Sequence, residues 1–194
     1  MEQTSPPDML VPPMKTLEGQ LREMYGRAAY THKTHEKMAD GYIGRYRLIK
    51  NVEIVLSAFS AGSMLLAVFG DSRPATIIGA LLSTILLGLT LYFKEASLGE
   101  QAQKHTVVAS KLWGVREAVL SLLVDMNDGR PIEEVRQRRD QLNELLEDIY
   151  KGAPRTNDTA YAAAQKALKH SEELFFADSE LDRLLPKSLR GGQK

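Results

Sequence analysis

Small and hydroxyl residues occur throughout two long uncharged stretches of the chain, residues 54–70 and 74–93. In lipid, such residues let helices approach closely, and their hydroxyl groups hydrogen-bond from one helix to the next. Polar groups can also line a water-filled path when several copies of a helix pair surround it. Both interpretations, packing of spans and lining of a pore, stay open for Ser57, Ser60, Ser63, Gly79, Ser83, Thr84 and Gly88.

Glu53 stands at the edge of the first uncharged stretch, about one turn after Lys50. A carboxylate at this position is typical of an interfacial residue rather than of a buried ion site, because a charge inside a membrane is costly. In a symmetric oligomer, a ring of Glu53 carboxylates would favour cations. Glu53 is therefore the candidate pore-mouth charge.

Three histidines could bring metal chemistry to the regions outside these stretches. His32 and His35 are three residues apart, a spacing at which two side chains on one helix face can share a metal. In a chain that folds back on itself, His105 would lie within about one and a half turns of His35. Two of the three fall in an apolar seam. We therefore expect the histidines to pack between helices, and we predict no metal site.

Enzyme signatures are missing from the sequence. It contains no Gly-rich phosphate loop, no Gly-x-Ser-x-Gly elbow and no metalloprotease histidine pair. Arg136, Arg138 and Arg139 could hold a phosphate, but acidic neighbours such as Glu133 and Glu144 favour a solvated helix face. We expect no catalytic residue, no cofactor and no enzymatic activity.

The composition narrows the class of partner and the compartment. Lysine and arginine total 25, as do aspartate and glutamate, so no basic excess indicates a nucleic-acid partner. Cysteine is absent, which excludes disulfides and thiolate metal sites and fits a reducing cytoplasm.

The two uncharged stretches are long enough to be membrane spans. At about 1.5 Å per residue, each covers about 25–30 Å, the thickness of the hydrocarbon core of a bilayer. Neither has the polar stripe of a soluble amphipathic helix, although a pair of buried core helices in a soluble domain is an alternative. We predict spans at about 52–70 and 74–93, joined by Asp71-Ser72-Arg73.

The helical pattern continues on both sides of the spans. From Leu17 to Ile49, apolar residues recur at steps of three and four, which predicts one helix from about residue 16 to about residue 70 with Thr16 as its cap. The same steps continue from the second span to Met126, and a Gly and a Pro in residues 127–131 end the second arm. The two arms are about equal in length, which predicts one antiparallel helical hairpin.

The remaining segments complete an all-α chain. Residues 1–14 are predicted to be a disordered, Pro-rich lead, residues 15–128 the hairpin, residues 129–189 a helical subdomain and residues 190–194 a flexible tail. The subdomain is expected to begin near Pro131, with later helices capped by Asn157 or Thr156 and by Asp178. The predicted fold is thus a membrane-spanning antiparallel helical hairpin with a long cytoplasmic helical stalk and a small C-terminal helical subdomain.

Charge at the ends of the spans predicts their orientation. The connecting loop contains only Arg73 beside Asp71, whereas basic residues lie at the other end of both spans: Arg45, Arg47, Lys50, Lys94 and Lys104. Because positive charge is retained on the cytoplasmic side, both arms and both termini are expected in the cytoplasm.

The order of these features, with the segments around Leu17–Tyr30, Trp113–Arg116 and Arg139–Pro154, resembles the SLATT family of bacterial two-transmembrane effectors. The resemblance covers about residues 15–189. It implies a location in the bacterial inner membrane and association with nucleotide-producing or nucleotide-sensing SMODS and SLOG partners. It also implies a pore-forming or membrane-perturbing role in anti-phage, abortive-infection defence. It brings no catalytic residues.

Two functions from different classes follow. One is an oligomeric effector, in contact with membrane lipid, that forms or gates a pore and is triggered through its cytoplasmic helices by a nucleotide signal or a partner protein. The alternative is a non-conducting membrane-anchored helical scaffold that recruits a cytoplasmic partner enzyme.

Overall fold

The computed structural model describes residues 16–70, 73–171, 173–174, 176–187 and 190. The predicted lead, Asp71 and Ser72 of the predicted loop and residues 191–194 of the predicted tail lie outside the described residues. Every regular element in the described part is a helix, two of them containing long apolar segments, so the all-helical prediction is confirmed.

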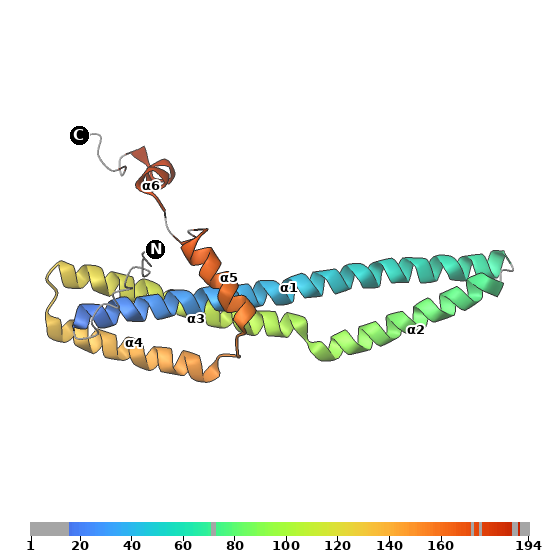
Figure 1. Ribbon diagram of the computed structural model, residues 1–194, viewed down its shortest axis with the longest axis horizontal. Coiled ribbons are helices and arrows are strands. Elements are labelled where there is room, and N and C mark those ends of the chain that lie inside the picture. Colours follow the sequence, from blue (N-terminus) through green and yellow to red (C-terminus); the bar gives the residue numbers. More distant parts are fainter. Residues whose placement is uncertain (1–15, 71–72, 172, 175, 188–189, 191–194) are drawn as a thin grey trace, which may run out of the picture.

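Six helices follow one another in the described part of the chain, and α1 runs along the length of the bundle (Figure 1). The chain then returns along α1, first as α2 and then as α3, and α4 packs on α3 while α5 crosses α1. Figure 1 shows α6 away from this bundle. The bounds are α1 Leu17–Phe69, α2 Arg73–Ala96, α3 Leu98–Asn127, α4 Ile132–Gly152, α5 Asp158–Lys169 and α6 Asp178–Leu184.

The helix starts follow local capping chemistry. Thr16 caps α1 by accepting a hydrogen bond from the Gly19 amide at 3.1 Å, as predicted, and Asn157 caps α5 by accepting one from Ala160 at 2.8 Å. The predicted cap of α6 is wrong by one residue, because Ala177 takes the cap position and Asp178 is the first helical residue. The Ala177 amide instead donates to Glu180, which satisfies a group that the helix leaves unpaired.

The core lies where α1, α3 and α4 meet. The apolar seam expected along both arms is buried there, and Leu21 and Met24 of α1 belong to one hydrophobic cluster with Leu112 of α3. Val135 and Leu142 of α4 belong to the same cluster. Because α4 shares this core with the long arms, its packing stabilises the contact between α1 and α3 as well as its own position.

The second arm is not one unbroken helix as expected. α2 ends at Ala96 and α3 begins at Leu98, and Ser97 between them has a positive φ of 45°. A serine hydroxyl competes for backbone groups, and that of Ser97 lies 3.4 Å from the Lys94 carbonyl. Figure 1 shows α2 bending away from α1 beside this break before it returns to α1 at the far end.

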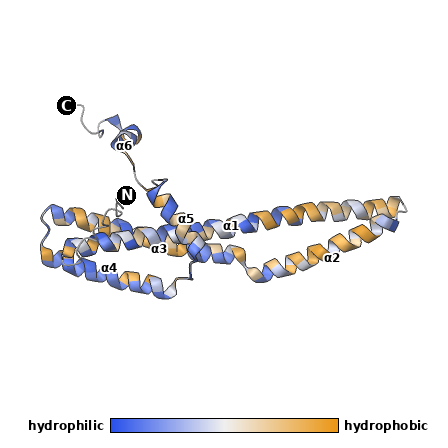
Figure 2. Ribbon diagram, in the orientation of Figure 1, coloured by the Kyte–Doolittle hydropathy of each residue, from blue (hydrophilic) through white to orange (hydrophobic). Residues whose placement is uncertain are grey.

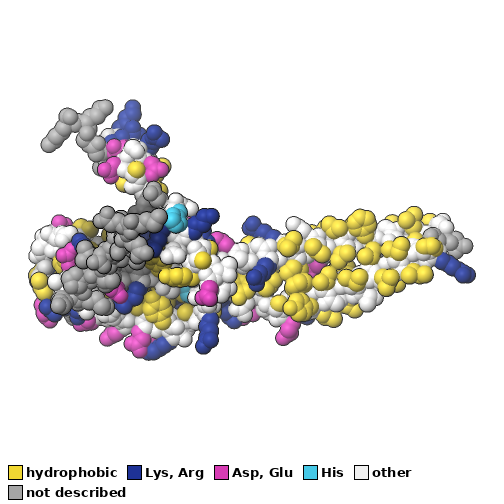
Figure 3. All heavy atoms as spheres, viewed as in Figure 1, with side chains coloured by type: hydrophobic (Ala, Val, Ile, Leu, Met, Phe, Trp, Pro, Cys, Tyr) yellow, Lys and Arg dark blue, Asp and Glu magenta, His cyan; other side chains and the backbone are white. Residues whose placement is uncertain are grey.

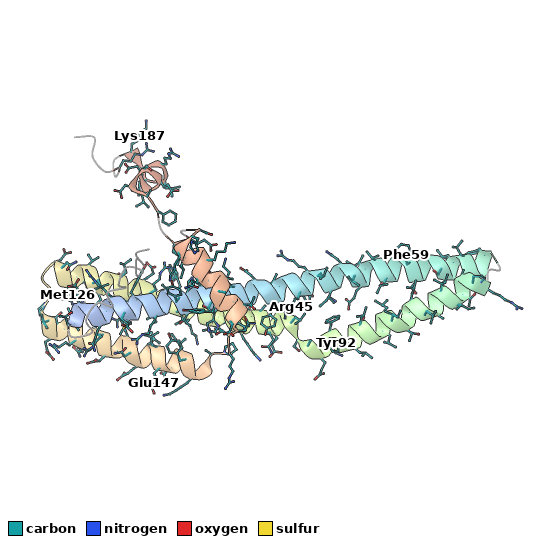
Figure 4. The ribbon with its side chains drawn as sticks, in the orientation of Figure 1. Arg45, Phe59, Tyr92, Met126, Glu147 and Lys187 are labelled. Carbon is teal, nitrogen blue, oxygen red and sulfur yellow. The ribbon has the colours of Figure 1, made fainter. Side chains whose placement is uncertain are left out.

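The far half of the molecule is apolar on its outside. Figures 2 and 3 show hydrophobic residues over α2 and the last part of α1, whereas charged side chains gather around the other end. Phe59 and Tyr92, both labelled in Figure 4, are 65% and 70% exposed. In the most apolar windows of residues 17–69 and 73–127, 0% and 6% of the residues are buried. The alternative of two core helices in a soluble domain would require buried windows, so this arrangement favours two membrane spans.

Candidate functional site

Four of the small residues singled out in the spans come together where α1 and α2 pack. The hydroxyl oxygens of Ser60 and Ser83 lie 2.6 Å apart, a hydrogen bond from one helix to the other. A Cβ atom added to Gly79 would lie only 3.2 Å from the Cβ of Ser63, tighter than an ordinary contact. The absence of a side chain at Gly79 therefore lets α2 approach α1 at this point.

Three further hydroxyl groups of the spans bond within their own helices. Ser57 donates to the Glu53 carbonyl at 2.7 Å, and Thr84 donates to the Ala80 carbonyl at 2.9 Å. Ser63 likewise donates to Phe59 at 2.9 Å. In a bilayer every polar group needs a partner inside the protein, and these bonds supply one.

Gly88 differs from Gly79 in its surroundings. No described atom lies within 4 Å of a Cβ added there, so Gly88 is not at the contact between α1 and α2. A hollow of about 380 Å³ remains between these helices around Gly79, with Met64 and Val68 among its mainly apolar lining residues. Sequence reasoning grouped the two glycines, but only Gly79 lies at the interface within one chain.

Glu53 joins the two helices at the edge of the spans. Its carboxylate accepts from Lys50 at 2.9 Å and from the hydroxyl of Thr90 on α2 at 3.3 Å. The side chain is 14% exposed. A pore mouth lined by Glu53 would need other copies of the chain around it, and it stays a prediction.

The histidines form a closer cluster than the sequence predicted. The Nδ1 atoms of His35 and His105 lie 2.8 Å apart, so α1 and α3 are joined directly rather than across one and a half turns. The ring of Tyr42 stacks on His105, and His32 Nδ1 lies 2.9 Å from the Ala109 carbonyl, to which it can donate. Among the described residues, no group of three or more His, Asp or Glu side chains is placed to hold a metal.

Burial keeps the central pair of imidazoles neutral. It lowers the pKa of His35 from 6.5 to about 4, with further lowering by the positive charges that His105 and His32 would carry. Burial also lowers the pKa of His105. One nitrogen of the pair must donate and the other accept, so a single proton lies between them and a second would place two donors face to face.

An ion-pair cluster that sequence reasoning missed ties α1 to the chain beyond α5. Lys33 is buried, and its ammonium lies 2.8 Å from Glu173 and 2.7 Å from Glu36. Burial lowers the pKa of Lys33, but the hydrogen bonds that its ammonium donates to Glu173 and Glu36 outweigh this effect, so the pKa is raised. Lys37 lies 3.3 Å from the same Glu173. The spacing of Lys33 and Glu36 is visible in the sequence, whereas the distant Glu173 is not.

The arginines singled out in α4 and the tryptophan of α3 make contacts at the surface of the helical body. Arg139 donates to Gln20 on α1 at 2.8 Å, and Arg138 donates to Gln141 at 2.9 Å. These contacts are typical of the solvated helix face that the sequence favours over a phosphate site. Trp113 is 51% exposed, so it lies at the surface of the bundle, and Arg116 pairs with its neighbour Glu117.

The bond between Ser60 and Ser83 makes a first testable prediction. We expect a double-mutant cycle of Ser60→Ala and Ser83→Ala to give a coupling free energy of about 1 kcal/mol, within the range for helix–helix hydrogen bonds in membranes. The measurement is unfolding of the purified protein in mixed detergent micelles. Ser57→Ala, which removes a bond inside α1, is the control and should not couple to Ser83→Ala. Coupling below about 0.3 kcal/mol would contradict the interaction.

Two apolar helices paired through small residues, on an all-helical body, define a membrane protein of the two-span helical class. Residues 17–180 match the model of the SMODS and SLOG-associating 2TM effector domain family 4, and the chain belongs to this family. The resemblance seen in the sequence is thereby confirmed, and membership makes the chain a defence-associated transmembrane effector. No curated protein and no solved structure matches the chain.

Proposed function

We propose that this protein is an oligomeric effector that forms or gates a pore in the bacterial inner membrane during anti-phage defence of the abortive-infection type. The observation that carries the proposal is the pairing of α1 and α2, whose outer surfaces are apolar and whose hydroxyl groups are bonded inside the pair. Such a pair is compatible with lipid. Because one pair of helices encloses no channel, conduction requires several copies.

The proposed arrangement divides the chain by environment. The two spans form a membrane hairpin, the rest of residues 15–128 forms a stalk in the cytoplasm, and residues 129–189 form a subdomain beside it. The ends of the spans that carry Lys50 and Lys94 face the cytoplasm, and the end with Arg73 faces outward. Both termini are then cytoplasmic.

Activation is proposed to act on the stalk. A nucleotide signal, or a partner that makes or senses nucleotides, would bias two arrangements of the helices by binding one of them more tightly. The contacts between α1 and α3 and the cluster of Lys33 with Glu173 link the stalk to the C-terminal segment, so they support a coupled response. The protein itself acts without catalysis or cofactor.

The experiment is ion flux from liposomes that contain the purified full-length protein of known oligomeric mass. We expect flux through the oligomer once the activating partner or nucleotide is present, and Glu53→Gln should reduce the preference for cations. A stable oligomer that conducts no ions with or without the signal would contradict the proposal.

The alternative is a membrane-anchored scaffold that recruits a cytoplasmic enzyme without conducting. The observation that favours it is that hydroxyl groups of the spans find their hydrogen-bond partners within one chain, and a membrane anchor requires no polar groups that face a pore. Replacing both spans by an unrelated membrane hairpin separates the two functions. A scaffold keeps its defence activity after this replacement, whereas a pore loses it.

A further inference from the structure

A cavity opens between α1 and α2 at the end of the spans nearest the body. It lies beside the break at Ser97, where α2 bends away from α1, and has a volume of about 280 Å³. Tyr46, Ile49, Lys50 and Glu53 of α1, Thr90, Phe93 and Lys94 of α2, and Leu98 of α3 line it. Since the uncharged stretches begin at residue 54 and end at residue 93, the cavity lies at the depth of lipid headgroups when both helices span a bilayer.

The charge in this cavity is suited to an anion. Lys50 pairs with Glu53, and Lys94 has no acidic partner among the described residues. Two lysines and one glutamate thus line the cavity, which gives its lining a net positive charge. Lys94 adds three hydrogen-bond donors that the described part of the chain leaves unused.

The other lining residues are those of a membrane interface. The ammonium of Lys50 lies 5.7 Å from the ring centre of Tyr46, and Phe93 lines the cavity from α2 while making an edge contact with Tyr92. Aromatic side chains with one apolar and one wet end are typical of the headgroup level, and lysines there extend toward the water. Ile49 and Leu98 add apolar surface to the lining of the cavity.

We propose that this cavity binds the phosphodiester group of a membrane phospholipid, with Lys94 and Lys50 on the phosphate. The acyl chains extend from it over the exposed apolar surfaces of α1 and α2. The inference rests on the proposed membrane arrangement of the spans. It adds a specific lipid site that holds α2 apart from α1 beside the break at Ser97.

The test uses native mass spectrometry to measure how much phosphatidylglycerol binds to the delipidated full-length protein in detergent. Each lysine near an anionic lipid surface contributes on the order of 1 kcal/mol, so Lys94→Gln should weaken binding about fivefold and the Lys50→Gln, Lys94→Gln double variant roughly 30-fold. Lys94→Arg should retain the affinity because it retains the charge. Equal circular dichroism spectra show that the variants are folded.

Arg73→Gln is the matched control, because it removes one positive charge at the opposite end of the spans. If Arg73→Gln weakens the binding of phosphatidylglycerol as much as Lys94→Gln does, the lipid is attracted unspecifically by positive charge, and the proposal is overturned. A second arm replaces the lipid with inorganic phosphate. If millimolar phosphate binds in the cavity and the phospholipid does not, the cavity is a site for a free anion, and the proposal is also overturned.

Failure of the lipid site is distinguishable from failure of the proposed function. Alkaline carbonate releases the chain from membranes if the helices do not span the bilayer, and both proposals then fail. A chain that stays in the membrane and conducts ions, but binds lipid equally with and without Lys94, contradicts the lipid site alone.

Discussion

Gly79→Leu is expected to abolish ion flux through the reconstituted oligomer, whereas Gly88→Leu should leave it within about twofold of the wild type, as surface substitutions do. At Gly79 even a Cβ atom would lie 3.2 Å from Ser63 and 3.8 Å from the Met64 amide nitrogen, so a leucine must push α2 away from α1. Overpacking of this kind costs about 1–3 kcal/mol. It also separates Ser60 from Ser83, whose bond lies at the same contact.

The comparison of the two glycines makes this a sharp test, because both variants add the same side chain to the same helix. Membrane insertion and oligomeric mass are measured beside flux. Loss of flux in Gly79→Leu with insertion retained attributes the effect to the contact between α1 and α2. Equal flux in both variants would show that the close approach at Gly79 has no part in conduction.

Acidification is expected to destabilise the body through His35 and His105. The pKa of His35 is about 4 in the folded protein and 6.5 as its ordinary value, and burial lowers the pKa of His105 as well. The unfolded chain therefore binds more protons between these values, and stability falls as the pH falls from about 6.5 toward 4. For His35 alone the loss amounts to roughly 3 kcal/mol, since one pKa unit corresponds to about 1.4 kcal/mol.

This loss is measured by thermal unfolding of the full-length protein in detergent between pH 4.5 and 8, with circular dichroism as the readout. Leucine at both positions removes the two titrating groups together, so the slope between pH 6.5 and 5 should largely disappear. His170→Gln, at an exposed position, is the control and should keep the wild-type slope. Below pH 5, Glu173 adds a loss of stability of its own, because the hydrogen bond that it accepts from Lys33 is the largest cause of its lowered pKa. An unchanged slope in the leucine variant would contradict the role of the pair.

The class of protein and its principal elements could be predicted from local sequence. α1 extends from Leu17 to Phe69 as its apolar steps and the Thr16 cap predict, because helix periodicity and capping depend on residues within a few positions. The uncharged stretches likewise indicate the spans, since crossing a bilayer is a matter of length and polarity. Trp113–Arg116 and the tail segments carried the resemblance to the family that the comparison confirms.

Which side chains meet across helices was decided by the tertiary structure alone. Steps of three and four placed His35 and His105 in seams without specifying register, and a shift of one turn, about 5.4 Å, would separate their nitrogens. Gly79 and Gly88 look equivalent in sequence, yet only the first packs against α1. The pairing of Lys33 with Glu173 also depends on the packed helices, because contacts between distant residues are set by the fold as a whole and leave no periodic signal in the chain.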